Sequence, residues 1–185
     1  MKRCEWPGSD DLMIAYHDEE WGVPVQDDKK WFEFIVLDTF QAGLSWNIVL
    51  HKREGFRKAF TNFEVEKVAQ FTPEQMEVLR ADKSIIRNKL KIKATVTNAQ
   101  AFIRIQKEFG SFNTYIWDFV GGKPIVNRFK NMKNIPAKTA LSDALSKDLY
   151  ARGFKFVGST ICYAFMQAGG LVNDHTTDCF RYEKV

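Results

Sequence analysis

The sequence predicts an all-α protein. Apolar residues recur at helical spacing in several segments, and capping residues stand at the ends of these segments. No stretch of useful length alternates apolar and polar residues as a half-buried strand does. The 185 residues are 45% hydrophobic and 27% charged, which allows one domain to bury a substantial core. We therefore expect a single domain over 1–185, arranged as two helical lobes.

Three helices are expected in the first two thirds of the chain. Apolar residues follow the helical repeat over 29–42. A second helix begins after Thr72, because threonine is a good N-cap, proline at the next position suits the first turn, and Gln75 completes a capping box. A third helix covers 88–108, and Gly110 stands where its C-terminal stop belongs.

Three more helices are expected after these, over 111–120, 142–153 and 160–168. Ser142 is expected to cap the middle one and Gly153 to end it. The loop over 123–140 contains two prolines and is the least regular stretch.

The helices that flank residue 85 are joined by a short link and predict a helical hairpin over 72–108. Such a hairpin can present backbone N–H groups and a helix N-terminus to a phosphate, here flanked by Arg87 and Lys89. The Gly-x-Gly turn that usually lets such a hairpin approach phosphates closely is missing. An ordinary αα-hairpin is the alternative.

Positive charge is concentrated along the chain, although the net charge is only +4. Two stretches, 83–107 and 119–142, carry lysines and arginines without a single acidic residue, whereas the acids gather over 10–20 and 64–82. A polyanion such as DNA could dock on one side of this molecule. A solvated basic face is the alternative.

The composition argues against membrane and secreted classes. No apolar run approaches the roughly 20 residues that a membrane helix needs, and no signal-like segment follows Met1. Three cysteines are an odd number, which fits core, metal or catalytic roles better than a disulfide framework. We expect a cytoplasmic protein.

Cysteine and histidine lie close to both ends of the chain, at Cys4, His17, His175 and Cys179. Two imidazoles and two thiolates would complete a closed tetrahedral zinc site, which is structural because no coordination position remains for water. Such a site would tie the two termini together and contribute to folding. Spacing alone leaves open that these are incidental thiols and surface histidines.

An acidic residue interrupts an aromatic region in the N-terminal third. Asp38 lies between apolar residues of the helix over 29–42, so its carboxylate must find donors or line a cavity. In an aromatic pocket it could accept hydrogen bonds from the amine of a base. Capping a neighbouring helix from inside the fold is the alternative. The following turn at Gly43 could push Leu44 into a stack of bases.

With these residues in view, the sequence resembles the constitutive bacterial 3-methyladenine DNA glycosylase I (Tag) family. The resemblance covers essentially the whole chain in the expected order. Its motifs are Arg3-Cys4 with Trp6, Ala15-Tyr16-His17-Asp18, Glu20-Trp21-Gly22-Val23-Pro24, Gln41-Ala42-Gly43-Leu44-Ser45-Trp46, Ser142 to Lys147, Arg152 to Gly158, Thr160 to Tyr163, Phe165 to Ala168 and Gly170 to His175.

The resemblance implies a helix-hairpin-helix DNA glycosylase fold, with the hairpin over 85–89 on the DNA backbone. It implies one structural zinc ion per chain, which joins the segments 4–17 and 175–179 through the four ligands named above.

It also implies a base pocket formed by Trp6, Tyr16, Trp21 and Trp46, with stacking from Trp46 and hydrogen bonding from Tyr16. Leu44, in the turn made by Gly43, is implied to wedge into the duplex.

Two pocket positions depart from the family pattern. The family usually has glutamate where this chain has Asp38, which shortens the reach of the carboxylate, and often has tyrosine where this chain has Met13.

The function that follows is base excision repair by a monofunctional glycosylase. The enzyme would act as a monomer on double-stranded DNA with alkylated bases, flip out 3-methyladenine and leave an abasic site. Asp38 would be the catalytic carboxylate, as a general base or as an electrostatic group. The alternative is a non-catalytic, zinc-stabilised module that binds alkylated or distorted DNA and could dispense with Asp38.

Overall fold

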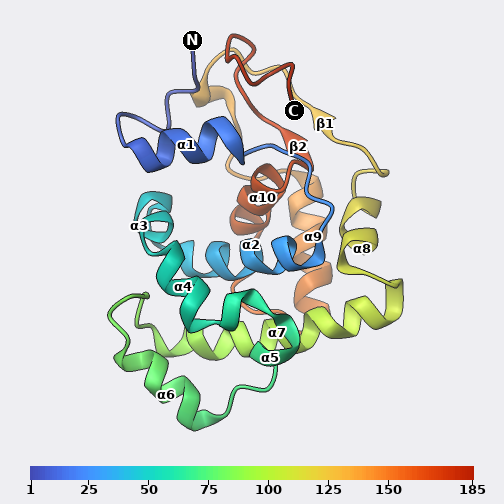
Figure 1. The fold of residues 1–185 in the computed structure, drawn as a ribbon. Helices are drawn as coiled ribbons and strands as arrows, with labels where there is room; N and C mark the ends of the chain where they lie inside the picture. Colours follow the sequence, from blue (N-terminus) through green and yellow to red (C-terminus); the bar gives the residue numbers. More distant parts are fainter.

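The computed structural model describes residues 1–185 and confirms the all-α class (Figure 1). Its elements, in chain order, are α1 (Asp11–Glu19), α2 (Asp28–Gln41), α3 (Trp46–His51), α4 (Arg53–Ala59), the 3₁₀ helix η1 (Thr61–Phe63), α5 (Val65–Val68), α6 (Pro73–Ala81), α7 (Lys89–Phe109), α8 (Phe112–Asp118), β1 (Ile125–Val126), the 3₁₀ helix η2 (Met132–Asn134), α9 (Ala140–Ala151), α10 (Ser159–Ala168) and β2 (Val172–Asn173).

Helix α2 is the centre of the core. It runs through the middle of the molecule (Figure 1), and every residue from Trp31 to Phe40 is buried. Burial of ten consecutive residues requires neighbours on every side of the helix, and α3, α7, α8 and α10 all pack against α2. Asp38 lies within this buried stretch, so the fold places its carboxylate inside the core.

The predicted hairpin ends are confirmed. Thr72 and Gln75 form the capping box of α6, with Pro73 in its first turn. Asn88 caps α7 through its side chain, and Gly110, at a φ of 83°, follows the last residue of that helix. Each of these helix ends is determined by residues within one turn of it in the sequence.

The start of α9 differs from the prediction. Thr139 is the N-cap, and Ser142 is the third residue of the helix. The Ser142 hydroxyl accepts a hydrogen bond from the backbone N–H of Thr139, while the Thr139 hydroxyl accepts one from Ser142 N–H. Ser142 therefore completes a reciprocal capping box instead of opening the helix.

Short elements occur where the sequence pattern is weak. Helices α3, α4 and α5 fill the stretch between the first two predicted helices. The irregular loop over 123–140 contributes β1, which pairs in parallel with β2 over two residues. This bridge brings the loop against the segment that leads to His175.

The two chain termini lie at the same end of the molecule, opposite α6 (Figure 1). The backbone N–H of Phe180 donates to the carbonyl of Lys2 at 3.0 Å, and the Lys2 ammonium pairs with the Asp178 carboxylate. None of the helices combines the length and apolar character that crossing a membrane requires.

Candidate active site and metal centre

An aromatic cavity of about 190 Å³ opens beside α2. All four predicted pocket aromatics line it together with Asp38. The complete lining is Trp6, Tyr16, Trp21, Asp38, Gln41, Trp46, Met132, Ala164, Gln167 and Ala168.

Asp38 is buried, with 2% of its surface exposed, and its Oδ2 has no hydrogen-bond partner. Burial raises the pKa of this carboxyl well above its usual range, because the charged form loses its hydration and gains no donor. No helix cap uses this side chain, so the capping alternative is wrong. A buried acceptor without a donor is costly, and at a functional site it indicates that a ligand supplies the missing donor.

Two tryptophans lack partners in the same cavity. The indole N–H groups of Trp6 and Trp46 are buried and donate to nothing in the protein. Two unused donors and one unused acceptor therefore belong to residues of a mainly apolar lining that also contains Gln41 and Gln167. This donor and acceptor set is suited to the edges of a flat heteroaromatic molecule.

The aromatic rings support one another around the cavity. The ring centroids of Tyr16 and Trp46 are 5.1 Å apart, and those of Trp6 and Trp21 are 5.2 Å apart. Burial, with the nearby carboxylate of Asp38, raises the pKa of Tyr16, so its hydroxyl stays protonated. Met13 is buried but does not line the cavity, so this departure from the family pattern lies outside the cavity wall.

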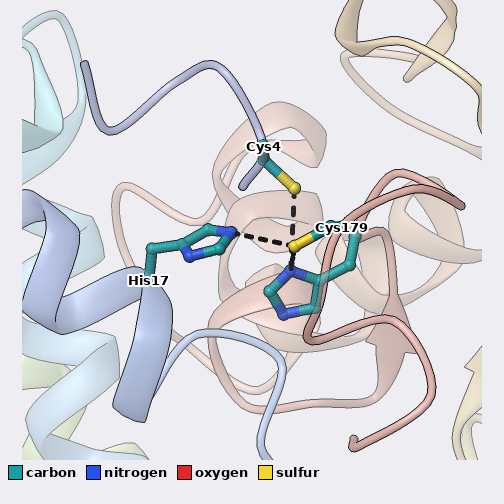
Figure 2. Close-up of side chains that lie close together, drawn as sticks. Cys4, His17 and Cys179 are labelled. Carbon is teal, nitrogen blue, oxygen red and sulfur yellow. Dashed lines mark hydrogen bonds between the residues drawn. The ribbon is translucent and has the colours of Figure 1, made fainter. Parts of the chain in front are cut away.

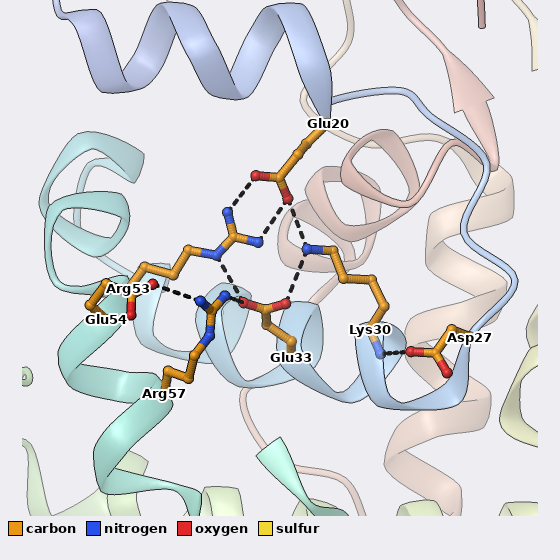
Figure 3. Close-up of polar contacts among 7 residues, drawn as sticks. All are labelled: Glu20, Asp27, Lys30, Glu33, Arg53, Glu54 and Arg57. Atoms are coloured by element: carbon orange, nitrogen blue, oxygen red, sulfur yellow. Dashed lines mark hydrogen bonds and ion pairs between the residues drawn. The ribbon is translucent and has the colours of Figure 1, made fainter. Parts of the chain in front are cut away.

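A network of charged side chains holds the end of α1 against α2 and α4 (Figure 3). Glu20, which follows α1, accepts two hydrogen bonds from the Arg53 guanidinium at 2.6 and 2.7 Å and one from Lys30 at 2.8 Å. Glu33 accepts from Arg53 at 2.8 Å and from Lys30 at 3.0 Å.

Although burial alone would raise it, the hydrogen bonds from Arg53 and Lys30 lower the pKa of Glu20 to about 2. The same partners lower the pKa of Glu33 against the effect of burial. Both carboxylates are therefore ionised at neutral pH. Because Tyr16 lies on α1, one turn before Glu20, this network also fixes a wall of the cavity.

The four predicted metal ligands come together at the chain ends. Cys4, His17, His175 and Cys179 are all buried, and one potential ligand atom from each lies within 4.8 Å of the others. Figure 2 shows Cys4, His17 and Cys179 pointing toward one another from the N-terminal segment, α1 and the C-terminal segment.

Each of the two histidines uses one ring nitrogen for a hydrogen bond within the protein, which leaves the other ring nitrogen free to bind a metal. His17 Nδ1 bonds the Asp18 carboxylate at 2.7 Å, and His175 Nε2 bonds the carbonyl of Trp21 at 3.0 Å. His17 Nε2 and His175 Nδ1 therefore face the two sulfurs. A hydrogen bond to the second ring nitrogen is typical of histidines that bind metal. The cluster is a candidate metal centre.

Two tryptophans of the cavity wall also lie against histidines of the candidate metal centre. The Trp21 ring lies 4.6 Å from that of His175, and the Trp6 ring lies 5.5 Å from that of His17. None of the four metal ligands lines the cavity. The metal centre therefore supports the cavity wall from behind.

The predicted DNA contacts lie on the surface. Arg87 and Lys89 are exposed at the link between α6 and α7. Gly43 has a φ of 77°, which favours glycine, and Leu44 beside it is 40% exposed. Lys91, one of the residues in the basic stretch, is instead buried.

The sequence did not single out several lining residues. Gln41, Gln167 and Ala168 fall within the family motifs, whereas Ala164 lies between two of them. Ala164, Gln167 and Ala168 lie along one face of α10. For Gln41, Gln167 and Ala168, their place in those motifs is the one sequence feature that could have identified them. Met132 comes from the irregular loop, where no pattern identifies it.

Comparison with known proteins agrees with this geometry. The model of the methyladenine glycosylase family matches residues 6–182. The chain is 50% identical over 182 residues to DNA-3-methyladenine glycosylase 1 of Escherichia coli (strain K12), covering 98% of this chain and 97% of the relative. It is 47% identical over 177 residues to DNA-3-methyladenine glycosylase of Haemophilus influenzae, covering 96% of each.

Solved structures share the fold. A crystal structure of 3-methyladenine DNA glycosylase I superposes with a TM-score of 0.94 at 49% identity, covering 97% of this chain and 98% of that one. The Staphylococcus aureus enzyme gives a TM-score of 0.94 at 36% identity, covering 97% and 96%. A tyrosine-to-phenylalanine variant of 3-methyladenine DNA glycosylase I in complex with 3-methyladenine also gives 0.94, at 35% identity, covering 97% of each chain. The chain belongs to the methyladenine glycosylase family.

Proposed function

We propose that this chain is a DNA glycosylase that removes 3-methyladenine from alkylated DNA and leaves an abasic site. The main support for this proposal is the aromatic cavity, in which the Asp38 carboxylate accepts no hydrogen bond from the protein. Relatives that carry this activity in their names match nearly the whole chain, and a related enzyme binds 3-methyladenine.

The cavity can bind the base through complementary edges. The unpartnered Asp38 oxygen is an acceptor for the exocyclic amine, and the free indole N–H groups of Trp6 and Trp46 are donors for ring nitrogens. Trp46, Trp21 and Tyr16 supply aromatic faces and edges. A buried carboxylate also favours a cationic purine over a neutral one, because opposite charges attract strongly where water is excluded.

Methylation at N3 already places positive charge on adenine, so cleavage of the glycosidic bond releases a neutral base with little need for an acid. The sugar then resembles an oxocarbenium ion and is attacked by water. No lysine lines the cavity, which supports a monofunctional reaction without a Schiff base. Asp38 stabilises the cationic nucleotide or orients the water.

We propose that the metal is a structural zinc ion held by Cys4, His17, His175 and Cys179. A tetrahedral zinc ion with bonds of about 2.3 Å to sulfur and about 2.0 Å to nitrogen places those atoms about 3.5 Å apart. Three of the four sulfur–nitrogen distances are 3.5, 3.5 and 3.6 Å. With four protein ligands the ion has no open position, so its contribution is to join the chain ends.

Binding to the duplex would use the hairpin and the Gly43 turn. Arg87 and Lys89 are exposed beside the N-terminus of α7, where phosphates are favourably bound. Leu44 is exposed on its turn and would fill the space left by the flipped nucleotide. Because its relatives are bacterial repair enzymes, we propose that the protein acts in the cytoplasm, as a monomer.

Purified protein incubated with methylated DNA should release free 3-methyladenine and leave abasic sites that alkali cleaves afterwards. Chromatography of the released bases and gel analysis of the strands measure the two products. Strand cleavage before alkali would contradict the monofunctional reaction. Binding to methylated DNA with no release, even at high enzyme excess, would favour a non-catalytic module instead.

A further inference from the structure

Lys91 is the one buried lysine of this protein, and its ammonium group binds the end of another helix. Only 5% of the residue is exposed. Its Nζ donates to the carbonyl oxygens of Phe40 at 2.8 Å and Ala42 at 2.5 Å. These two carbonyls stand at the C-terminus of α2, while Lys91 lies in the first turn of α7.

The end of α2 needs this partner. The last carbonyls of a helix receive no hydrogen bond from within the helix. The negative end of the helix dipole lies there as well and favours a cation. Helix α2 has no basic residue in its own last turn. The Leu44 N–H donates to the Gln41 carbonyl at 2.7 Å. Lys91 donates to the carbonyls of the residues before and after Gln41.

The two segments that Lys91 joins are both parts of the proposed DNA interface. Its own helix begins at Lys89, beside the exposed Arg87 of the hairpin. The carbonyl of Ala42 immediately precedes Gly43, whose φ of 77° turns the chain toward the exposed Leu44.

We propose that Lys91 is a positioning residue that couples the grip of the hairpin on the DNA backbone to the placement of Leu44 in the duplex. Lys91 itself touches no base. It holds the start of the Gly43 turn at a set place relative to the N-terminus of α7, so that phosphates bound there bring Leu44 to the lesion. This inference rests on the proposed function.

The test compares excision of 3-methyladenine from duplex and single-stranded DNA under single-turnover conditions. A duplex requires extrusion of the base, whereas a single strand requires much less. Lys91→Met removes both hydrogen bonds and should slow duplex excision by about tenfold, as expected for the loss of roughly 1.4 kcal/mol from two buried acceptors. The rate on single strands should stay within about twofold of wild type.

Lys107→Met is the matched control. It removes the same charge from an exposed site on the same helix, 16 residues or about 24 Å further along, and should leave the ratio of the two rates unchanged. Adding Lys91→Met to Leu44→Ala should cause no further loss on duplex DNA, because Lys91 acts through Leu44.

Equal loss on both substrates, or an additive loss in the double variant, would overturn the coupling and leave Lys91 a general stabilising residue. A variant that fails to fold loses both rates and its circular dichroism signal. In that case Lys91→Gln, which is polar but too short to reach both carbonyls, should lower the same ratio. Wild-type protein that releases no base from either substrate would contradict the proposed function itself.

Discussion

Replacing Asp38 by asparagine should stabilise the protein, and more so as the pH rises. In the folded protein the carboxyl is buried without a donor, which raises its pKa well above the value of 3.8 that it has when exposed. Asparagine has nearly the same shape and carries no charge at any pH. The variant therefore removes the cost of burying a carboxylate while it leaves the packing of α2 in place.

The magnitude follows from proton linkage. Above pH 3.8 the unfolded chain loses the Asp38 proton, whereas the folded chain keeps it until its raised pKa is reached. Over that window the wild-type protein loses about 1.4 kcal/mol of stability per pH unit relative to Asp38→Asn. Below the window the difference is small, and above it the difference is constant.

Urea unfolding of both proteins at half-unit pH steps from 4.5 to 8 measures this difference, because every other titrating group is common to both and cancels. The free energy of unfolding of Asp38→Asn minus that of wild type should rise with pH for as long as the folded carboxyl keeps its proton. A difference that stays flat from the lowest pH would show that the Asp38 carboxylate is not held at an unfavourable site.

Other perturbations test the remaining parts of the structure. Cys179→Ala should reduce bound metal in elemental analysis and lower the free energy of unfolding by about 4 kcal/mol or more; an unchanged melting temperature would count against a structural metal. Arg53→Ala leaves Glu33 buried without its main partner and should cost about 3 kcal/mol in chemical denaturation; a loss within error would mean that Lys30 suffices. Trp46→Ala removes a stacking face and should weaken binding of free 3-methyladenine by about tenfold or more in calorimetry. Asp38→Glu restores the family's usual reach and should raise the single-turnover excision rate; a lower rate would show that the pocket has adapted to aspartate.

The helix boundaries that the sequence predicted well are those with local causes. Thr72, Pro73 and Gln75 form the start of α6 within a single turn, and Asn88 and Gly110 bound α7 in the same way. Such caps depend on neighbours in the chain, so the residue types alone reveal them.

Features that depend on distant contacts were not predictable in the same way. Lys91 falls in a run of basic residues, and only the packing of α7 on α2 shows that it is buried. The network around Glu20 and Arg53 joins residues 33 positions apart, which no helical spacing indicates. The sequence predicts Ser142 as the N-cap because serine is a preferred N-cap residue, whereas the third helical position of a capping box more often carries glutamate or glutamine than the serine found here.

The candidate site combines features that the sequence reveals with features that only the fold reveals. Two cysteines and two histidines near the chain ends stand out in the sequence, but their spacing does not show that they meet. The fold brings them together. Asp38 stands out by its apolar neighbours in the sequence. The absence of any donor to it, which supports the proposal that the cavity binds a base, is a property of the folded structure alone.

The central claim is that the chemistry takes place at Asp38 in the aromatic cavity, and that the metal centre only supports this cavity. The most direct test is the release of 3-methyladenine from methylated DNA by Asp38→Asn protein whose metal content has been measured. We expect release to fall below a hundredth of the wild-type rate, about 2.7 kcal/mol in the barrier, with an unchanged amount of metal per chain. Release at the wild-type rate by a protein that keeps its metal would contradict the claim.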